Sequence, residues 1–115
     1  MLLICLWCTI ALQAQPAEKP LVVMVHYTAQ PGKGAEAVKA LKLLLAEVKK
    51  EPHYLGIRML VQPDKPESIL LYEQWAQAEY YRGAHMQTPH LQAFIVASRA
   101  FLAGPPEISF WQSAD

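Results

Sequence analysis

The order in which strand-like and helix-like apolar patterns follow each other most constrains what this chain can fold into. Runs rich in β-branched and aromatic residues indicate strands, and apolar residues spaced three or four apart indicate amphipathic helices. Strand patterns cover residues 21–28, 54–62, 68–75 and 107–112, helical patterns cover 35–50 and 89–103, and residues 63–67 are expected as a loop. The order β-α-β-β-α-β predicts the ferredoxin-like α+β fold, in which two helices cover one face of a four-stranded antiparallel sheet.

The predicted second long helix has clear start and stop signals. Thr88 suits the N-cap position and Pro89 the first helical position, whereas Gly104 with the prolines after it is typical of a helix end. His90 then falls in the first turn, where the positive end of the helix dipole opposes protonation of its imidazole.

The first 15 residues are expected to be a signal peptide, followed by one domain over 20–113. An uninterrupted apolar run extends from Leu2 to Leu12, and Ala14 offers a small residue for cleavage. The run is too short to span a bilayer, which needs about 20 residues. We therefore expect a periplasmic or secreted protein with no stable membrane insertion after processing, or a cytoplasmic one if the run is not a signal.

The composition limits the kinds of partner that this protein can be expected to bind. Ten basic residues balance ten acidic ones, so no electrostatic footprint for nucleic acid is present. Apolar residues make up 53% of the chain, and the strand over 68–75 is apolar on both sides: Ile69 and Leu71 point one way, Leu70 and Tyr72 the other. Strands buried on both faces need two covers, and the helices supply one. A homodimer is expected, with either phase of this strand in the interface.

Glu73 and Trp75 lie two residues apart at the end of that strand and therefore share a face with Leu71. A carboxylate in such an apolar setting is costly unless it is paired or neutralised. Its expected partner is Arg82, His85 or His26. Glu73 is either a buried structural acceptor or a general base, and Trp75 is either core or a wall for a flat substrate.

The histidines, too, can be interpreted either as structural residues or as functional ones. His26 lies mid-strand and is either a satisfied core residue or a substrate contact. His85 and His90 are five residues apart across a prolyl break, which does not match the spacing of a helical metal pair, so no metal site is expected.

These residues also form a motif: a strand ending in Glu73-x-Trp75, an aromatic residue at Tyr80, His-x-x-Thr-Pro-His over 85–90, and Phe94 four residues later. The motif resembles the antibiotic biosynthesis monooxygenase family, in particular its quinol monooxygenase branch. The resemblance implies a dimeric α+β barrel, formed by two sheets packed face to face. It also implies a cofactor-independent monooxygenase that uses dioxygen and a small quinol, phenolic or polyketide-like molecule.

Haem degradation, another activity in that family, is disfavoured, since Ala84 and Phe94 stand near the positions of its Trp and His and the first strand has no Asn. Two alternatives remain open: an isomerase or degrading enzyme for a small oxygenated signal molecule, and a non-catalytic ligand-binding dimer. The candidate catalytic residues are His90, His85, Glu73 and His26, and the candidate substrate-binding residues are Trp75, Tyr80, Phe94 and Arg82, with no cofactor.

Overall fold

A computed structural model describes residues 19–115, so the expected signal peptide over 1–15 lies outside the described residues. The elements are β1 (Leu21–Thr28), α1 (Gly34–Val48), β2 (Tyr54–Gln62), β3 (Lys65–Trp75), α2 (Ala78–Arg82), the 3-10 turn η1 (Ala84–Gln87), α3 (Pro89–Ala97), the 3-10 turn η2 (Ser98–Ala100) and β4 (Glu107–Trp111). The predicted order β-α-β-β-α-β and the ferredoxin-like α+β fold are confirmed.

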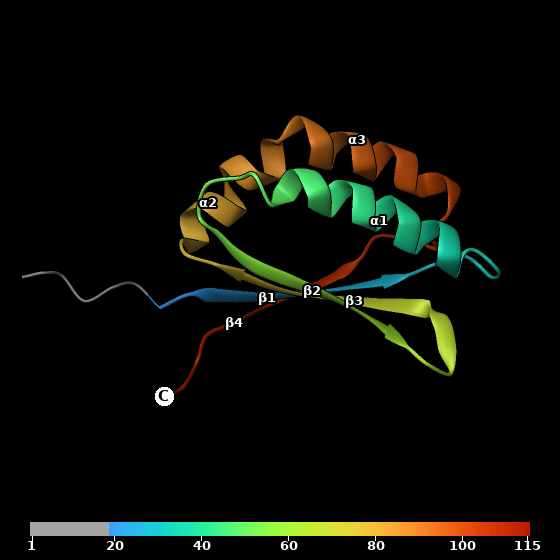
Figure 1. Ribbon diagram of the computed structural model, residues 1–115, viewed down its shortest axis with the longest axis horizontal. Helices are drawn as coiled ribbons and strands as arrows, with labels where there is room; N and C mark the ends of the chain where they lie inside the picture. Colours follow the sequence, from blue (N-terminus) through green and yellow to red (C-terminus); the bar gives the residue numbers. More distant parts are fainter. Residues whose placement is uncertain (1–18) are drawn as a thin grey trace, which may run out of the picture.

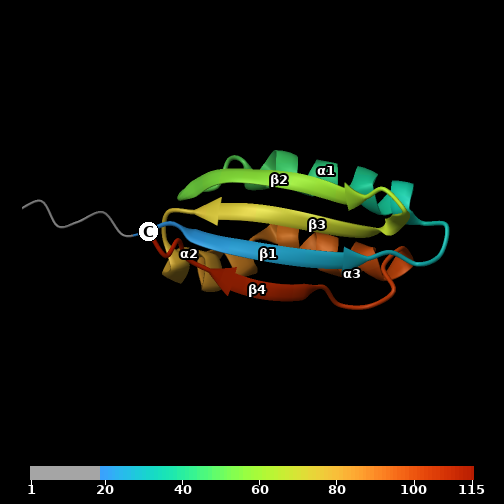
Figure 2. The same ribbon diagram turned by 90° about the horizontal axis from the view of Figure 1, so that it is seen from below.

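The four strands form one antiparallel sheet in the order β2-β3-β1-β4. Helices α1, α2 and α3 all lie on one face of it (Figure 1). Seen from the other side, the sheet is uncovered by any element of the described chain (Figure 2). In residues 19–115 no helix is long and apolar enough to cross a membrane.

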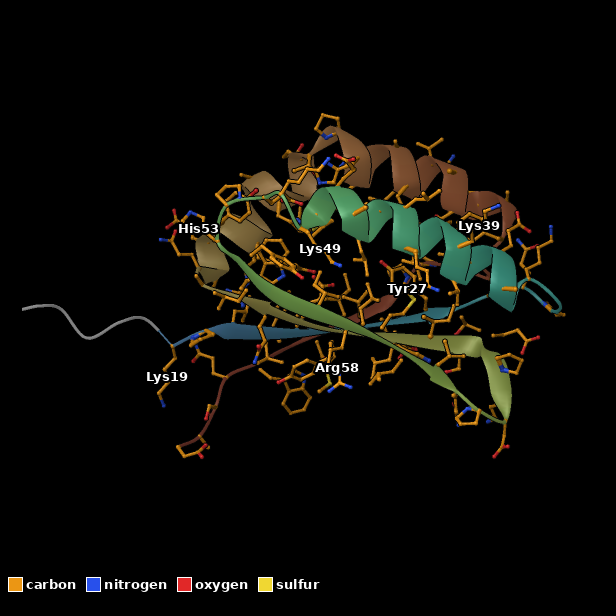
Figure 3. All side chains as sticks on the ribbon, viewed as in Figure 1. Lys19, Tyr27, Lys39, Lys49, His53 and Arg58 are labelled. Carbon is orange, nitrogen blue, oxygen red and sulfur yellow. The ribbon has the colours of Figure 1, made fainter. Side chains whose placement is uncertain are left out.

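Side chains of the central strands β1 and β3 point alternately to the two faces of the sheet, and their burial shows which set faces the helices. Ile69 and Leu71 of β3 are buried beneath the helices, while Leu70 and Tyr72 are half-buried on the open face. Figure 3 shows the ring of Tyr27 in the layer between sheet and helices, and Arg58 projecting from the open face. The core therefore lies between the sheet and the helices.

Two predicted boundaries were wrong. The expected loop over 63–67 shortens to a tight turn, because Gln62 pairs with Lys65 and β3 begins there. The last helix was expected to reach residue 103, but α3 ends at Ala97 and one 3-10 turn follows. The backbone N–H of Ala103 donates to the carbonyl of Thr28, and the side-chain amide of Gln30 donates to the carbonyls of Arg99 and Leu102, so contacts with the end of β1 and the loop after it take the place of a further helical turn.

Two backbone positions hold the connections in place. A Cβ on Gly34 would overlap the carbonyl oxygen of Pro66, so only glycine lets α1 begin this close to β3. His53, in the loop between α1 and β2, has a φ of 67°. This left-handed conformation is unfavourable for any residue other than glycine. The carbonyl of His53 accepts a hydrogen bond from the backbone N–H of Ala76, which ties this loop to the end of β3.

Candidate active site

A cavity of about 640 Å³ lies between the sheet and the helices. Its walls are mostly apolar and come from β1, β3, α1 and α3, with Leu45, Leu71, Leu91 and Phe94 among them. Four groups that can exchange protons also line it: Glu73, His85, Tyr27 and Tyr81. A largely apolar cavity with a few convergent polar groups is the usual form of a small-molecule site.

Glu73 is a buried carboxyl group in the cavity wall. One oxygen, Oε1, accepts a hydrogen bond of 3.0 Å from the indole Nε1–H of Trp75, so the expected partners Arg82, His85 and His26 were wrong. Burial raises the pKa of Glu73 to about 7; the bond from Trp75 opposes that rise and the charge of Glu51 adds to it. Glu73 can therefore gain or lose a proton near neutral pH.

The two tyrosines respond to the same carboxyl group. Burial raises the pKa of Tyr27 well above its ordinary value, and the negative charge of Glu73 raises it further. Burial, Glu73 and Tyr27 do the same, in that order, for the pKa of Tyr81. Both phenols therefore stay protonated at neutral pH and can donate hydrogen bonds to a ligand in the cavity.

Behind the cavity, Glu51 gathers three hydrogen bonds. Its Oε1 accepts from the hydroxyl of Tyr80 at 2.8 Å and from Nδ1 of His85 at 2.9 Å, and its Oε2 accepts from Nε2 of His90 at 2.8 Å. The side chain of Glu51 is only 5% exposed. Burial alone would raise the pKa of Glu51, but the bonds from His90, His85 and Tyr80 outweigh it and hold that pKa below its ordinary value.

The two motif histidines thus meet at one carboxylate but occupy different places. His85 in η1 is buried and lines the cavity, whereas His90 in α3 is half-buried and does not line it. Thr88 is the N-cap residue, as predicted, yet its hydroxyl donates to the carbonyl of His85 at 2.9 Å instead of capping the helix. This bond joins the start of α3 to the turn that carries His85.

The four candidate substrate-binding residues also differ in whether they line the cavity. Of the four, Phe94 lines the cavity. Trp75 is fully buried beneath the rings of His85, Tyr80 and Tyr81, with centroid separations of 4.6, 5.9 and 5.6 Å. It supports the site from behind.

The hydroxyl of Tyr80 is engaged with Glu51, and partial burial, that hydrogen bond and the charge of Glu51 raise the pKa of Tyr80 to about 12. Arg82 is exposed, with its guanidinium 4.7 Å from the ring centroid of Phe110. Neither residue lines the cavity.

His26 lies on the open face of the sheet, away from this cavity. Its Nε2 is 2.7 Å from Oγ of Ser68, and its Nδ1 is 4.0 Å from the exposed carboxylate of Glu107. It shares the open face with Leu70, its neighbour in the β1–β3 pairing. The structure therefore places Glu73 and His85 in the wall of one cavity, joins His90 to His85 through the shared carboxylate of Glu51, and separates His26 from all three.

Sequence reasoning missed Glu51, Tyr27 and Tyr81. Glu51 follows the last turn of a helix and precedes a proline, which marks it only as a loop residue. Tyr27 and Tyr81 have the face and burial of core residues, and only the cavity shows that they line a site. Within residues 19–115, no group of three or more His, Cys, Asp or Glu side chains is arranged to hold a metal ion.

The fold and the cavity define a single-domain α+β protein of the ferredoxin-like class with a site between sheet and helices. The sequence profile of the antibiotic biosynthesis monooxygenase family matches residues 20–97. The chain belongs to that family. No functionally curated protein matches the sequence.

Solved structures share this fold at low sequence identity. A protein from Pseudomonas aeruginosa is 21% identical, with a TM-score of 0.79 over 88% of this chain and 100% of its own. A candidate antibiotic biosynthesis monooxygenase from Nitrosomonas europaea is 19% identical, with a TM-score of 0.76 over 84% of this chain and 91% of its own. A further candidate monooxygenase, from Bordetella bronchiseptica, is 14% identical, with a TM-score of 0.76 over 85% of this chain and 100% of its own.

Proposed function

We propose that this protein is a cofactor-independent monooxygenase of a small quinol, phenolic or polyketide-like molecule. The observation that carries the proposal is the apolar cavity into which a carboxyl group with a pKa of about 7, an imidazole and two protonated phenols open. Groups that exchange protons near neutral pH suit deprotonation of a phenol. An apolar wall of leucine and phenylalanine side chains suits an aromatic ring.

In the proposed reaction the substrate supplies the electrons. A base at the cavity takes the phenolic proton, and the phenolate then gives one electron to dioxygen, forming superoxide and a substrate radical. Superoxide and the radical recombine at a ring carbon that carries a hydrogen, ortho or para to the oxygen, and the proton held by the base completes the hydroperoxide. Loss of water from this hydroperoxide gives a quinone, so that phenol and dioxygen yield quinone and water with all atoms balanced.

The hydrogen-bond donors of the cavity have a role in this sequence. Both superoxide and the departing peroxide oxygen carry negative charge, and donors fixed in a water-poor site stabilise such charge most effectively. Tyr27 and Tyr81 are two such donors, held by packing in the core. The apolar walls also keep bulk water from the radical intermediate.

We further propose that the protein works as a homodimer joined through the open sheet face. That face carries half-buried Met24, Leu70 and Tyr72 together with Leu60 and Trp111, which are 45% and 55% exposed. Contiguous apolar surface of this kind marks an interaction site. Light scattering should give twice the monomer mass at micromolar concentration, and a stable monomer would contradict the dimer.

Oxygen consumption tests the enzyme proposal. Purified protein should consume dioxygen with at least one member of a panel of naphthols, anthrones and hydroquinones, without added flavin or metal. The variant Glu73→Gln, which keeps an acceptor for Trp75 but cannot ionise, should alter the pH dependence of the rate. Conversion of a substrate without dioxygen would favour an isomerase or degrading enzyme, and binding without turnover would favour a ligand-binding dimer.

A further inference from the structure

Glu51 determines which nitrogen of His85 carries a proton. The hydrogen bonds from three donors keep Glu51 ionised at neutral pH, and an ionised carboxylate can only accept. Nδ1 of His85, 2.9 Å from Oε1, must therefore be the donor. Whenever this imidazole is neutral, one nitrogen donates and the other accepts, so Nε2 of His85 then carries the lone pair.

This lone pair opens onto the cavity. Nε2 of His85 has no hydrogen-bond partner among residues 19–115, and no fully buried side-chain nitrogen or oxygen in that part of the chain is left without one. Nε2 must then have accessible surface, and His85 lines the cavity. Since His85 is otherwise buried and lines the cavity, we take the accessible surface of Nε2 to face a cavity ligand.

The surrounding rings fix the direction of that nitrogen. The imidazole of His85 stacks on Tyr81 with centroids 4.8 Å apart and planes 22° apart, and its centroid is 4.6 Å from that of Trp75. Tilting the ring out of its plane would break both ring contacts, and flipping it by 180° would take Nδ1 away from Glu51. Glu51 is held in turn by Tyr80 and His90, as described above, so the carboxylate does not have to be ordered when a substrate binds.

We propose that Glu51 is the positioning residue that holds His85 with its Nε2 toward the cavity, where this nitrogen takes the proton of a bound phenol. The inference rests on the function proposed above and deepens it by assigning the base. In the proton step the phenolic O–H bond breaks, its electron pair stays on oxygen, and an N–H bond forms at Nε2. The resulting imidazolium keeps its Nδ1–H on Glu51, whose negative charge stabilises it.

Several ionisable groups face His85, and their signs agree with this assignment. Glu51 contacts it directly, and Tyr80 and His90 reach it through that carboxylate. The phenol of Tyr81 stacks on its ring and stays protonated. Tyr27, Glu73 and Arg99 also line the cavity. The phenol of Tyr27 stays protonated, the guanidinium of Arg99 favours a phenolate, and Glu73 is a donor to the phenolate when protonated and a rival acceptor when ionised.

The tautomer can be measured without any substrate. Nitrogen-15 NMR of the wild-type protein should show His85 protonated at Nδ1 and unprotonated at Nε2. In Glu51→Ala, with folding checked by circular dichroism, this preference should disappear. The tautomer with the proton on Nε2 in wild type, or an unchanged tautomer in Glu51→Ala, would overturn the inference.

Proton transfer can be measured with 4-nitrophenol, whose anion absorbs visible light. Bound at pH 6, the dye should be more ionised than in solution with wild-type protein, and this excess should vanish in His85→Gln. Glu51→Gln preserves size and should lower the ionisation constant of the bound dye roughly tenfold, because one negative charge beside the imidazole is lost. Glu47→Gln, which removes an exposed charge paired with Lys50, is the matched control and should behave as wild type.

The turnover assay then separates this inference from the proposed function. With an active quinol substrate, Glu51→Gln should lower kcat by roughly 10- to 100-fold, the range found when a metal-bound histidine loses its outer hydrogen-bond partner, and should move the acidic limb of the pH profile to lower pH. A Glu51→Gln variant with the dye ionisation and pH profile of Glu47→Gln would overturn the positioning role. Absence of oxygen consumption by wild type, with the tautomer and dye results intact, would instead reject the oxygenase and retain the Glu51–His85 pair.

Discussion

Replacing Glu73 by Gln should stabilise the protein relative to wild type, and this stabilisation should increase as the pH rises. A carboxyl group whose pKa rises from 4.5 in the unfolded chain to about 7 in the folded protein disfavours folding once it ionises. At 1.36 kcal/mol for each pH unit between these values, ionised Glu73 costs about 3 kcal/mol. Glutamine keeps an oxygen for the indole N–H of Trp75 and removes this cost.

The sign of the effect follows from which state holds the proton. Below pH 4.5 both the folded and the unfolded chain carry the proton on Glu73, so this group adds no pH dependence. Between pH 4.5 and 7 the unfolded chain has lost the proton and the folded protein has not, so wild type loses stability as pH rises. Above about pH 7 the loss is complete.

Urea denaturation from pH 4 to pH 8, at one protein concentration, measures this effect. The free energy of unfolding of Glu73→Gln minus that of wild type should increase by about 3 kcal/mol across the range. Glu47→Gln serves as the control, since its exposed ion pair with Lys50 should contribute less than about 1 kcal/mol at every pH. A difference between Glu73→Gln and wild type that is constant from pH 4 to pH 8 would refute the reasoning.

Three further predictions concern stability. Glu51→Gln should destabilise the protein at pH 7 by about 1–3 kcal/mol, and the difference from wild type should shrink as the pH falls through the lowered pKa of Glu51; urea titrations at pH 3 and pH 7 test this. Gly34→Ala should cost about 1–3 kcal/mol, because its Cβ meets the backbone of Pro66, and an unchanged melting temperature would contradict that contact. His53→Gly should be more stable than His53→Ala by about 1 kcal/mol, since both lose the histidine ring and only alanine bears the cost of positive φ; equal denaturation midpoints would contradict it.

The fold was predictable from the sequence because each element has its own period and end signals. β1 and β2 match the predicted ranges 21–28 and 54–62, since both are bounded by turn residues. The end of α3 was not predictable, because Ala103 and Arg99 there bond to Thr28 and Gln30, and Gln30 is 69 residues away from Arg99 in the chain. Such long-range hydrogen bonds leave no local pattern.

The candidate site was predictable in part. The spacing of Glu73 and Trp75 predicted that they share a strand face, and both are buried on the same face of β3. His85 packs against Trp75, but its predicted pairing with Glu73 was wrong. The role of Glu51 could not be predicted from the sequence, since a single glutamate before a proline belongs to no repeating pattern. The sequence predicts His85 and His90 as catalytic candidates and Tyr80 as a substrate contact, whereas the structure joins all three to one carboxylate that lies 29 to 39 residues earlier in the chain.

The central claim, that this cavity inserts one atom of dioxygen into a phenolic substrate without a cofactor, is tested most directly with isotopically labelled oxygen. The quinol or naphthol that supports the fastest oxygen consumption is incubated with the purified protein under ¹⁸O₂, with and without a metal chelator. The product quinone should contain one ¹⁸O atom for each dioxygen consumed, and the chelator should leave the rate unchanged. Product formed under nitrogen, product oxygen derived from water alone, or activity that requires added flavin or metal would contradict the account.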